Sequence, residues 1–90
     1  MGARILIVTR MPTVFVHKGY RVSFYSYDLR ERIHVHVFKA GSECKVWMDN
    51  LEIGFNRGFR AHEIAEIREL LTERRNEVIQ KWQEHERRAE

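Results

Sequence analysis

Residues Ile33–Met48 read IHVHVFKAGSECKVWM, two alternating runs separated by a turn that contains a glycine. Side chains along a β-strand alternate between two faces with a period of two. The first run therefore places Val35 and Val37 on one face of a strand and the two imidazoles of His34 and His36 on the other. The short glycine-containing connection is typical of a hairpin, so the stretch predicts two antiparallel strands.

The chain on either side of this hairpin extends it into a meander. Alternation and turn residues predict strands at 12–17, 20–27, 33–39 and 43–49, with a bend or a short irregular strand over 49–58. Beyond residue 59 the apolar positions recur at helical spacing and form one continuous stripe: Ile64, Ile67, Leu71, Val78, Trp82 and His85. The stripe keeps its phase throughout, which predicts one long helix. No Ser, Thr or Asp stands at its N-cap, so we expect its start to be loosely fixed.

The fold class predicted from these elements is α+β: an antiparallel meander of three to five strands packed on one long C-terminal helix. Residues 1–90 form a single domain, with the sheet over 11–59 and the helix over 60–88. Residues 1–10 are expected to be an N-terminal extension or an added edge strand.

Charge, hydropathy and cysteine content limit the classes of protein to which the chain can belong. The 90 residues carry 16 Lys and Arg against 13 Asp and Glu, a net charge of +3, and the positive excess lies in the first two-thirds of the chain. This charge is compatible with an anionic partner and is also common in proteins without one.

The apolar run after Arg4 is too short for a membrane span or a signal sequence, so we expect a cytoplasmic protein with no membrane partner. The lone Cys44 is expected to be a small core residue.

Alternation divides the predicted sheet into two unlike faces. The apolar face should receive the helix and consists of Val22, Phe24, Ile33, Val35, Val37, Cys44, Val46 and Met48. The other face is basic, aromatic and rich in hydrogen-bonding groups, and collects Arg21, Tyr25, Tyr27, His34, His36, Phe38, Lys45 and Trp47. Rings that stack on bases and cations that contact phosphates would suit RNA or DNA. A face of this kind can equally be covered by the N-terminal segment or by a second subunit.

The two histidines admit three interpretations. As general acid and base they would be the catalytic candidates, suited to cleaving RNA beside Arg21 and Lys45. As metal ligands they would need a third donor, and none of His17, His62, His85, Asp49 and Glu43 has a diagnostic spacing, so we predict no metal site and no cofactor. As ordinary strand residues they would bond to their neighbours.

Several fragments in a fixed order resemble a bacterial family of small uncharacterised proteins, a domain of unknown function. They are MPTVF at 11–15, GYR at 19–21, FYS at 24–26, HVHV at 34–37, KVW at 45–47 and NRGF at 56–59. The resemblance covers residues 11 to about 86. It implies a gene next to that of another small protein, in a pair often suspected to be a toxin–antitoxin-like module, and it implies no established activity. The family usually has two prolines before the first histidine, where this chain has Arg32 and Ile33.

The sequence therefore favours a small intracellular binding protein over an enzyme, as one component of a toxin–antitoxin-like pair. Its predicted binding surface is Arg21, Tyr25, His34, His36, Lys45 and Trp47. The expected partner is another protein or a second copy of the chain, with RNA or DNA as a further candidate. The alternatives are an RNA-cleaving enzyme that uses His34 and His36, a homo-oligomer, and a metal-binding module.

Overall fold

The computed structural model describes residues 12–25 and 29–89. Five strands precede two helices along the chain: β1 (Thr13–His17), β2 (Tyr20–Ser23), β3 (His34–Lys39), β4 (Ser42–Trp47), β5 (Ile53–Arg57), α1 (Ala61–Glu73) and α2 (Arg75–Ala89). The predicted N-terminal extension over 1–10 and the predicted surface residue Tyr27 lie outside the described residues.

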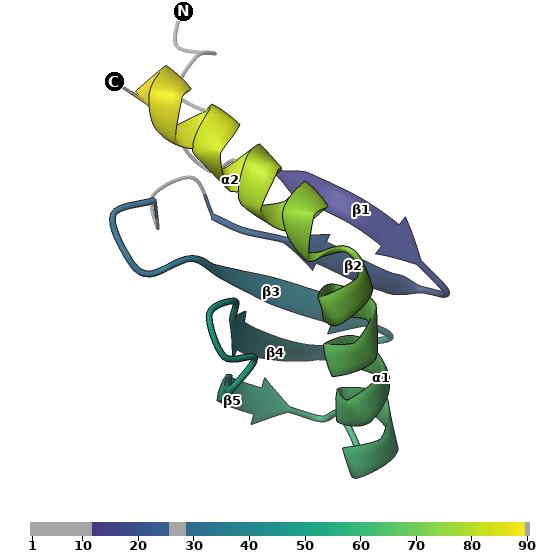
Figure 1. Cartoon of the computed structure of the whole chain (residues 1–90). Coiled ribbons are helices and arrows are strands. Elements are labelled where there is room, and N and C mark those ends of the chain that lie inside the picture. The colour runs from purple at the N-terminus through teal and green to yellow at the C-terminus, as the bar shows by residue number, and fades with distance from the viewer. Residues whose placement is uncertain (1–11, 26–28, 90) are drawn as a thin grey trace, which may run out of the picture.

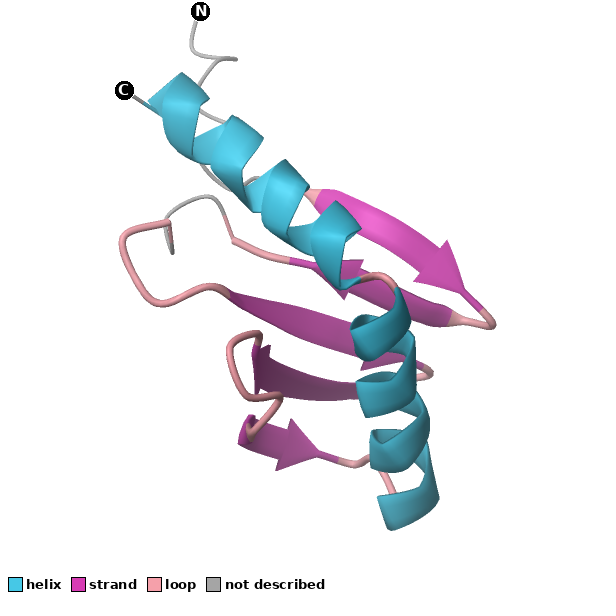
Figure 2. Cartoon of the chain, viewed as in Figure 1, coloured by secondary structure: helices cyan, strands magenta, loops and turns pink. Residues whose placement is uncertain are grey.

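The strands form one sheet in the order β1-β2-β3-β4-β5, and each pairs antiparallel with the next (Figure 1). Both helices lie on the same side of this sheet (Figure 2). The α+β class and the antiparallel meander are therefore confirmed. The segment predicted as a bend or a short irregular strand contains β5, which pairs with β4 through a register shift between Lys45 and Val46.

Two of the hairpins close through two-residue turns with both residues at positive φ. Lys18 and Gly19 have φ of 50° and 84°, and Ala40 and Gly41 have φ of 48° and 86°. These values are those of type I′ turns, whose twist matches that of the flanking strands. The second position is glycine in both turns, but Lys18 and Ala40 adopt a left-handed conformation that costs an ordinary residue about 1–2 kcal/mol.

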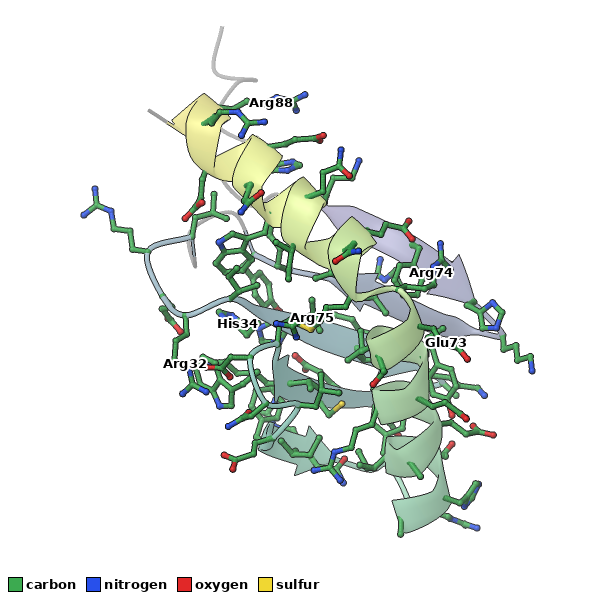
Figure 3. The ribbon with its side chains drawn as sticks, in the orientation of Figure 1. Arg32, His34, Glu73, Arg74, Arg75 and Arg88 are labelled. Atoms are coloured by element: carbon green, nitrogen blue, oxygen red, sulfur yellow. The ribbon has the colours of Figure 1, made fainter. Side chains whose placement is uncertain are left out.

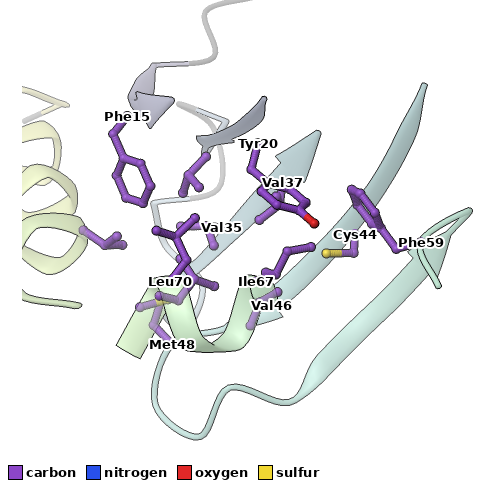
Figure 4. Close-up of a cluster of buried hydrophobic side chains, with 13 residues drawn as sticks. Phe15, Tyr20, Val35, Val37, Cys44, Val46, Met48, Phe59, Ile67 and Leu70 are labelled. Carbon is purple, nitrogen blue, oxygen red and sulfur yellow. The ribbon is translucent and has the colours of Figure 1, made fainter. Parts of the chain in front are cut away.

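The core lies between the sheet and the helices. Its sheet residues are Phe15, Tyr20, Val22, Val35, Val37, Cys44, Val46 and Met48, and they pack against Phe59, Ile67, Leu70, Leu71 and Val78 (Figure 4). These sheet residues alternate along β2, β3 and β4 as predicted. A hydrogen bond of 2.6 Å from the Tyr20 hydroxyl to the Glu66 carboxylate joins β2 to α1 at the edge of this core, and it lowers the pKa of Glu66.

The predicted single helix over 60–88 is wrong in one respect, because it is interrupted at Arg74. Arg74 has φ of −112° and ψ of 25°, and α2 leaves this point in a new direction, toward β1 and β2 (Figure 1). The guanidinium of Arg74 lies 3.7 Å from the centroid of the Phe15 ring, and Arg75 donates a hydrogen bond to the carbonyl of Met48. These two contacts hold the junction against the sheet. The bend lets both helices follow the twisted surface of the sheet, from which one straight helix would diverge.

The start of α1 is also firmer than its sequence indicates. The backbone N–H of Arg60 donates to the Glu63 carboxylate at 2.9 Å, and the side-chain amide of Asn56 bonds to both the N–H and the carbonyl of Phe59 at 3.0 Å. The carboxylate of Glu63, at the third position of the helix, thus helps to fix the helix start in the absence of a Ser, Thr or Asp N-cap. Neither helix is long and apolar enough to cross a membrane among the residues described.

The turn geometry predicts that Ala40→Asn will stabilise the fold by about 0.5–1 kcal/mol, because asparagine tolerates a left-handed conformation better than alanine. Chemical denaturation followed by circular dichroism measures this change. Gly41→Ala is the matched control: a Cβ at Gly41 would meet no atom within 4 Å, so its expected loss of about 1–2 kcal/mol would come from the backbone alone. Equal stability of all three proteins would contradict the assignment of the turn.

Candidate functional site

The side chains that face away from α1 and α2 form a surface that we call the helix-free face. Its members on β2 to β5 are Arg21, Ser23, His34, His36, Phe38, Glu43, Lys45, Trp47, Phe55 and Arg57, as the register of the strands requires. Tyr25, just beyond β2, joins them because its ring centroid lies 4.7 Å from that of His36. Both helices lie on the other side of the sheet (Figure 2), although Trp82 of α2 reaches His34 at one end of this face.

His34 lies beneath the helix-free face and is fully buried. Its Nδ1 atom is 2.9 Å from the carbonyl oxygen of Arg32, and its ring centroid lies 5.3 Å from Trp47 and 5.4 Å from Trp82 of α2. Among the described residues, Ser23 and His36 are the last pair between β2 and β3. This pairing therefore stops before His34, and Trp82 reaches His34 at this end of the sheet. Figure 3 shows Arg32 and His34 together at the start of β3.

His36 is nearly buried as well, with 6% of its surface exposed. Its Nδ1 atom lies 3.1 Å from the Glu43 carboxylate of β4. Aromatic rings surround the imidazole: Phe38 stacks on it at 6.4 Å between centroids, and Phe55 lies at 5.8 Å. The pair of histidines is therefore packed into a layer of rings, and the centroids of the two imidazoles are 5.4 Å apart.

Trp47 is partly exposed and carries two cations on its ring. The guanidinium of Arg32 and the ammonium of Lys45 each lie 4.3 Å from the ring centroid. Gly54 on the neighbouring strand makes room for this arrangement, since a Cβ there would lie 3.1 Å from the Lys45 Cδ atom and 3.3 Å from the Trp47 Nε1 atom. Cation–π contacts at exposed sites contribute about 0.5–1 kcal/mol each and fix the orientation of both partners.

Most cations of the helix-free face are balanced by carboxylates. Arg32 binds Asp49 through two hydrogen bonds of 2.7 and 2.9 Å, which hold the pKa of Asp49 below its ordinary value. Lys45 lies 3.4 Å from Glu31. In the same way, the Arg57 guanidinium lies 3.7 Å from Glu43 and also rests on the Phe55 ring. The face is therefore rich in rings and charges but close to neutral.

The structure brings together five of the six residues predicted as a binding surface, Arg21, Tyr25, His36, Lys45 and Trp47, and places His34 beneath them. Sequence reasoning missed Phe55 and Arg57, together with the carboxylates that neutralise the cations. The alternation of Ile53, Phe55 and Arg57 along the chain was the signal for these two residues, but Gly54 and the register shift beside it obscured the strand.

Metal ligation and thiol chemistry find no support among the residues that the structure describes at and behind this face. Within residues 12–25 and 29–89, no three or more His, Cys, Asp or Glu side chains are placed to hold a metal ion. Cys44 lies on the opposite, core side, where burial and then the charge of Glu43 raise the pKa of its thiol to about 12. The thiol is protonated at neutral pH and is not a nucleophile.

The close approach at Gly54 predicts that Gly54→Val will displace the Lys45 stem from the Trp47 ring. The Lys45 side-chain protons should then lose the upfield ring-current shift that an aromatic face imposes, and NMR measures this directly. Because Gly54 is exposed, the free energy of unfolding should change by no more than about 1 kcal/mol. Trp47→Leu provides the reference spectrum without a ring. A Lys45 shift unaltered by Gly54→Val would contradict the proposed arrangement.

Comparison with known proteins adds a family but no activity. The family model described as "Domain of unknown function (DUF4160)" matches residues 19–83. This range holds β2 to β5, α1 and most of α2, and therefore every residue assigned above to the helix-free face. No curated protein and no solved structure matches the chain. With most of its length covered by one family model, the chain belongs to the DUF4160 family.

Proposed function

We propose that this chain is a small intracellular binding protein that docks a protein partner on its helix-free face. The observation that carries the proposal is a set of three partly exposed rings on that face, Phe38, Trp47 and Phe55, each in contact with a cation. Arg21 lies 5.0 Å from the centroid of Phe38, Arg32 and Lys45 flank Trp47, and Arg57 lies 4.7 Å from Phe55. Fixed rings offer large contact areas at little cost in side-chain entropy.

The composition of the face favours a protein over a nucleic acid. Aromatic residues and arginine are enriched at protein–protein interfaces and supply most of the residues that dominate binding energy. A nucleic-acid surface draws its affinity from cations that neutralise phosphates. Three of the cations here, Arg32, Lys45 and Arg57, are already paired with carboxylates. A partner with mixed polarity matches this face better than a polyanion does.

Family resemblance supplies the candidate partner. It implies that the gene lies beside that of another small protein, in a pair suspected to be a toxin–antitoxin-like module. We infer that the chain is one component of such a pair and that the adjacently encoded protein covers Trp47 and its neighbours.

The alternative functions have less support. RNA cleavage by His34 and His36 would need both imidazoles to reach a phosphodiester, but His34 is fully buried and His36 nearly so. A metal-binding module would need a third ligand, and the described residues supply no such group. Self-association through the same face would bury the same rings, and it is an outcome of the experiment below.

The experiment is co-expression of the chain with the protein encoded beside it in a bacterial host, followed by size-exclusion chromatography with light scattering. We expect a hetero-complex, and we expect Trp47→Ser to weaken it by about thirtyfold or more, as is typical of a central interface tryptophan. Trp47→Phe keeps a ring and should retain most of the affinity. Gln80→Ala, on the exposed side of α2, should bind like the wild type.

A complex whose affinity is the same with Trp47→Ser as with Gln80→Ala would contradict the location of the interface. A chain that remains monomeric beside its neighbour, with no effect of either protein on growth of the host, would contradict the proposed pair. A homodimer that Trp47→Ser dissociates would replace the protein partner with a second copy. Circular dichroism of each variant separates these outcomes from a failure to fold.

A further inference from the structure

A cavity of about 330 Å³ opens at one end of the helix-free face, where the Ala40–Gly41 turn joins β3 to β4. The residues that matter in its lining are Arg21, Phe38, Lys39, Gly41, Ser42 and Glu43. Arg21, Phe38 and Glu43 line the cavity from the helix-free face, and the backbone of the turn closes its end. The cavity lies at the far end of β3 from His34 and the flanked ring of Trp47.

Arg21 differs from the other cations of the face. Among the described residues, Arg32, Lys45 and Arg57 each lie within 4 Å of a carboxylate oxygen, and Arg21 does not. Its guanidinium lies 5.0 Å from the centroid of Phe38. An arginine that rests on a ring keeps its in-plane N–H donors available, and these donors fit the two oxygens of a carboxylate or phosphate.

Lys39, the other basic residue of the lining, brings no second cation to the helix-free face, because it alternates with Phe38 and lies on the helix side of β3. Its ammonium lies 4.3 Å from the centroid of the Tyr20 ring. The stem crosses close to Gly19, where a Cβ would lie 3.3 Å from the Lys39 Cε atom. The ammonium of Lys39 is thus held on the helix side of the sheet, over the ring whose hydroxyl bonds to Glu66.

Glu43 also lies in the lining, but its carboxylate is already shared by His36 at 3.1 Å and Arg57 at 3.7 Å. Among the described residues, Arg21 is therefore the one uncompensated charge that the cavity offers on the helix-free face. One guanidinium with a fork of two donors matches the single charge and the two oxygens of a carboxylate.

We propose that this cavity receives an aspartate or glutamate side chain of the partner protein, bound by the Arg21 guanidinium. The proposal rests on the function proposed above, because it assumes that a protein covers the helix-free face. It adds the chemistry of one contact: an acidic residue of the partner lies beside the Ala40–Gly41 turn. Docking would then be anchored at two separate points, the ring of Trp47 and the cavity at Arg21.

The test is an NMR titration of the isotope-labelled full chain with a blocked tetraglutamate peptide, and separately with blocked tetraglutamine and with inorganic phosphate. We expect tetraglutamate to give saturable shifts at the Arg21 Nε–H and at the amides of Gly41 and Ser42. Arg21→Gln should weaken this binding by about tenfold, the loss expected for a charge-assisted hydrogen bond. Arg30→Gln removes the same charge from an exposed turn and should leave it unchanged.

Tetraglutamine that binds as well as tetraglutamate would overturn the proposal, as would shifts that Arg30→Gln reduces as much as Arg21→Gln. Phosphate that binds at these amides more tightly than tetraglutamate would overturn the assignment of a carboxylate. The partner protein is not present in this titration. A failure at this cavity can therefore be told apart from a failure of the proposed complex, which is measured with the adjacently encoded protein.

Discussion

The strict alternation of side chains along β3 is the constraint on which the rest of the structure depends. Val35 and Val37 are fully buried against the helices, and the intervening His36 and Phe38 belong to the opposite face. A shift of one residue would turn the valines to the helix-free face and the imidazoles toward the helices. The packing of α1 on the sheet fixes this register, and with it the positions of every ring on the helix-free face.

Much of the fold could be predicted because its signals are local. The alternation of Val35, Val37, Cys44 and Val46 and the glycine turns specify the hairpins. The break at Arg74 could not be predicted from periodicity. Arg74 still accepts a hydrogen bond from Val78 and donates one to Leu70, so the apolar stripe keeps its phase across the bend. What bends the chain there is contact with Phe15 and Met48, which are distant in sequence.

The sequence predicts which residues lie at the candidate site better than it predicts their charge balance and burial. Alternation placed Arg21, Lys45 and Trp47 on one surface, which suggested a basic face. The neutralising carboxylates come from Glu31 and Asp49, outside the strands, and from Glu43. No spacing rule pairs such residues, since their contacts depend on how the loops at the strand ends fold back. The burial of His34 is equally non-local, because Trp82 approaches it from a helix 48 positions away in the chain.

Separation of the two faces is the central claim, and stability measurements on adjacent positions of β3 test it most directly. Urea unfolding of Val37→Ala should show a loss of about 2 kcal/mol, because Val37 lies in the closed core. Phe38→Ser, one residue along, should cost less than about 1 kcal/mol, because its partly exposed ring supports binding and not folding. Equal losses at the two positions, or a larger loss at Phe38, would contradict this account.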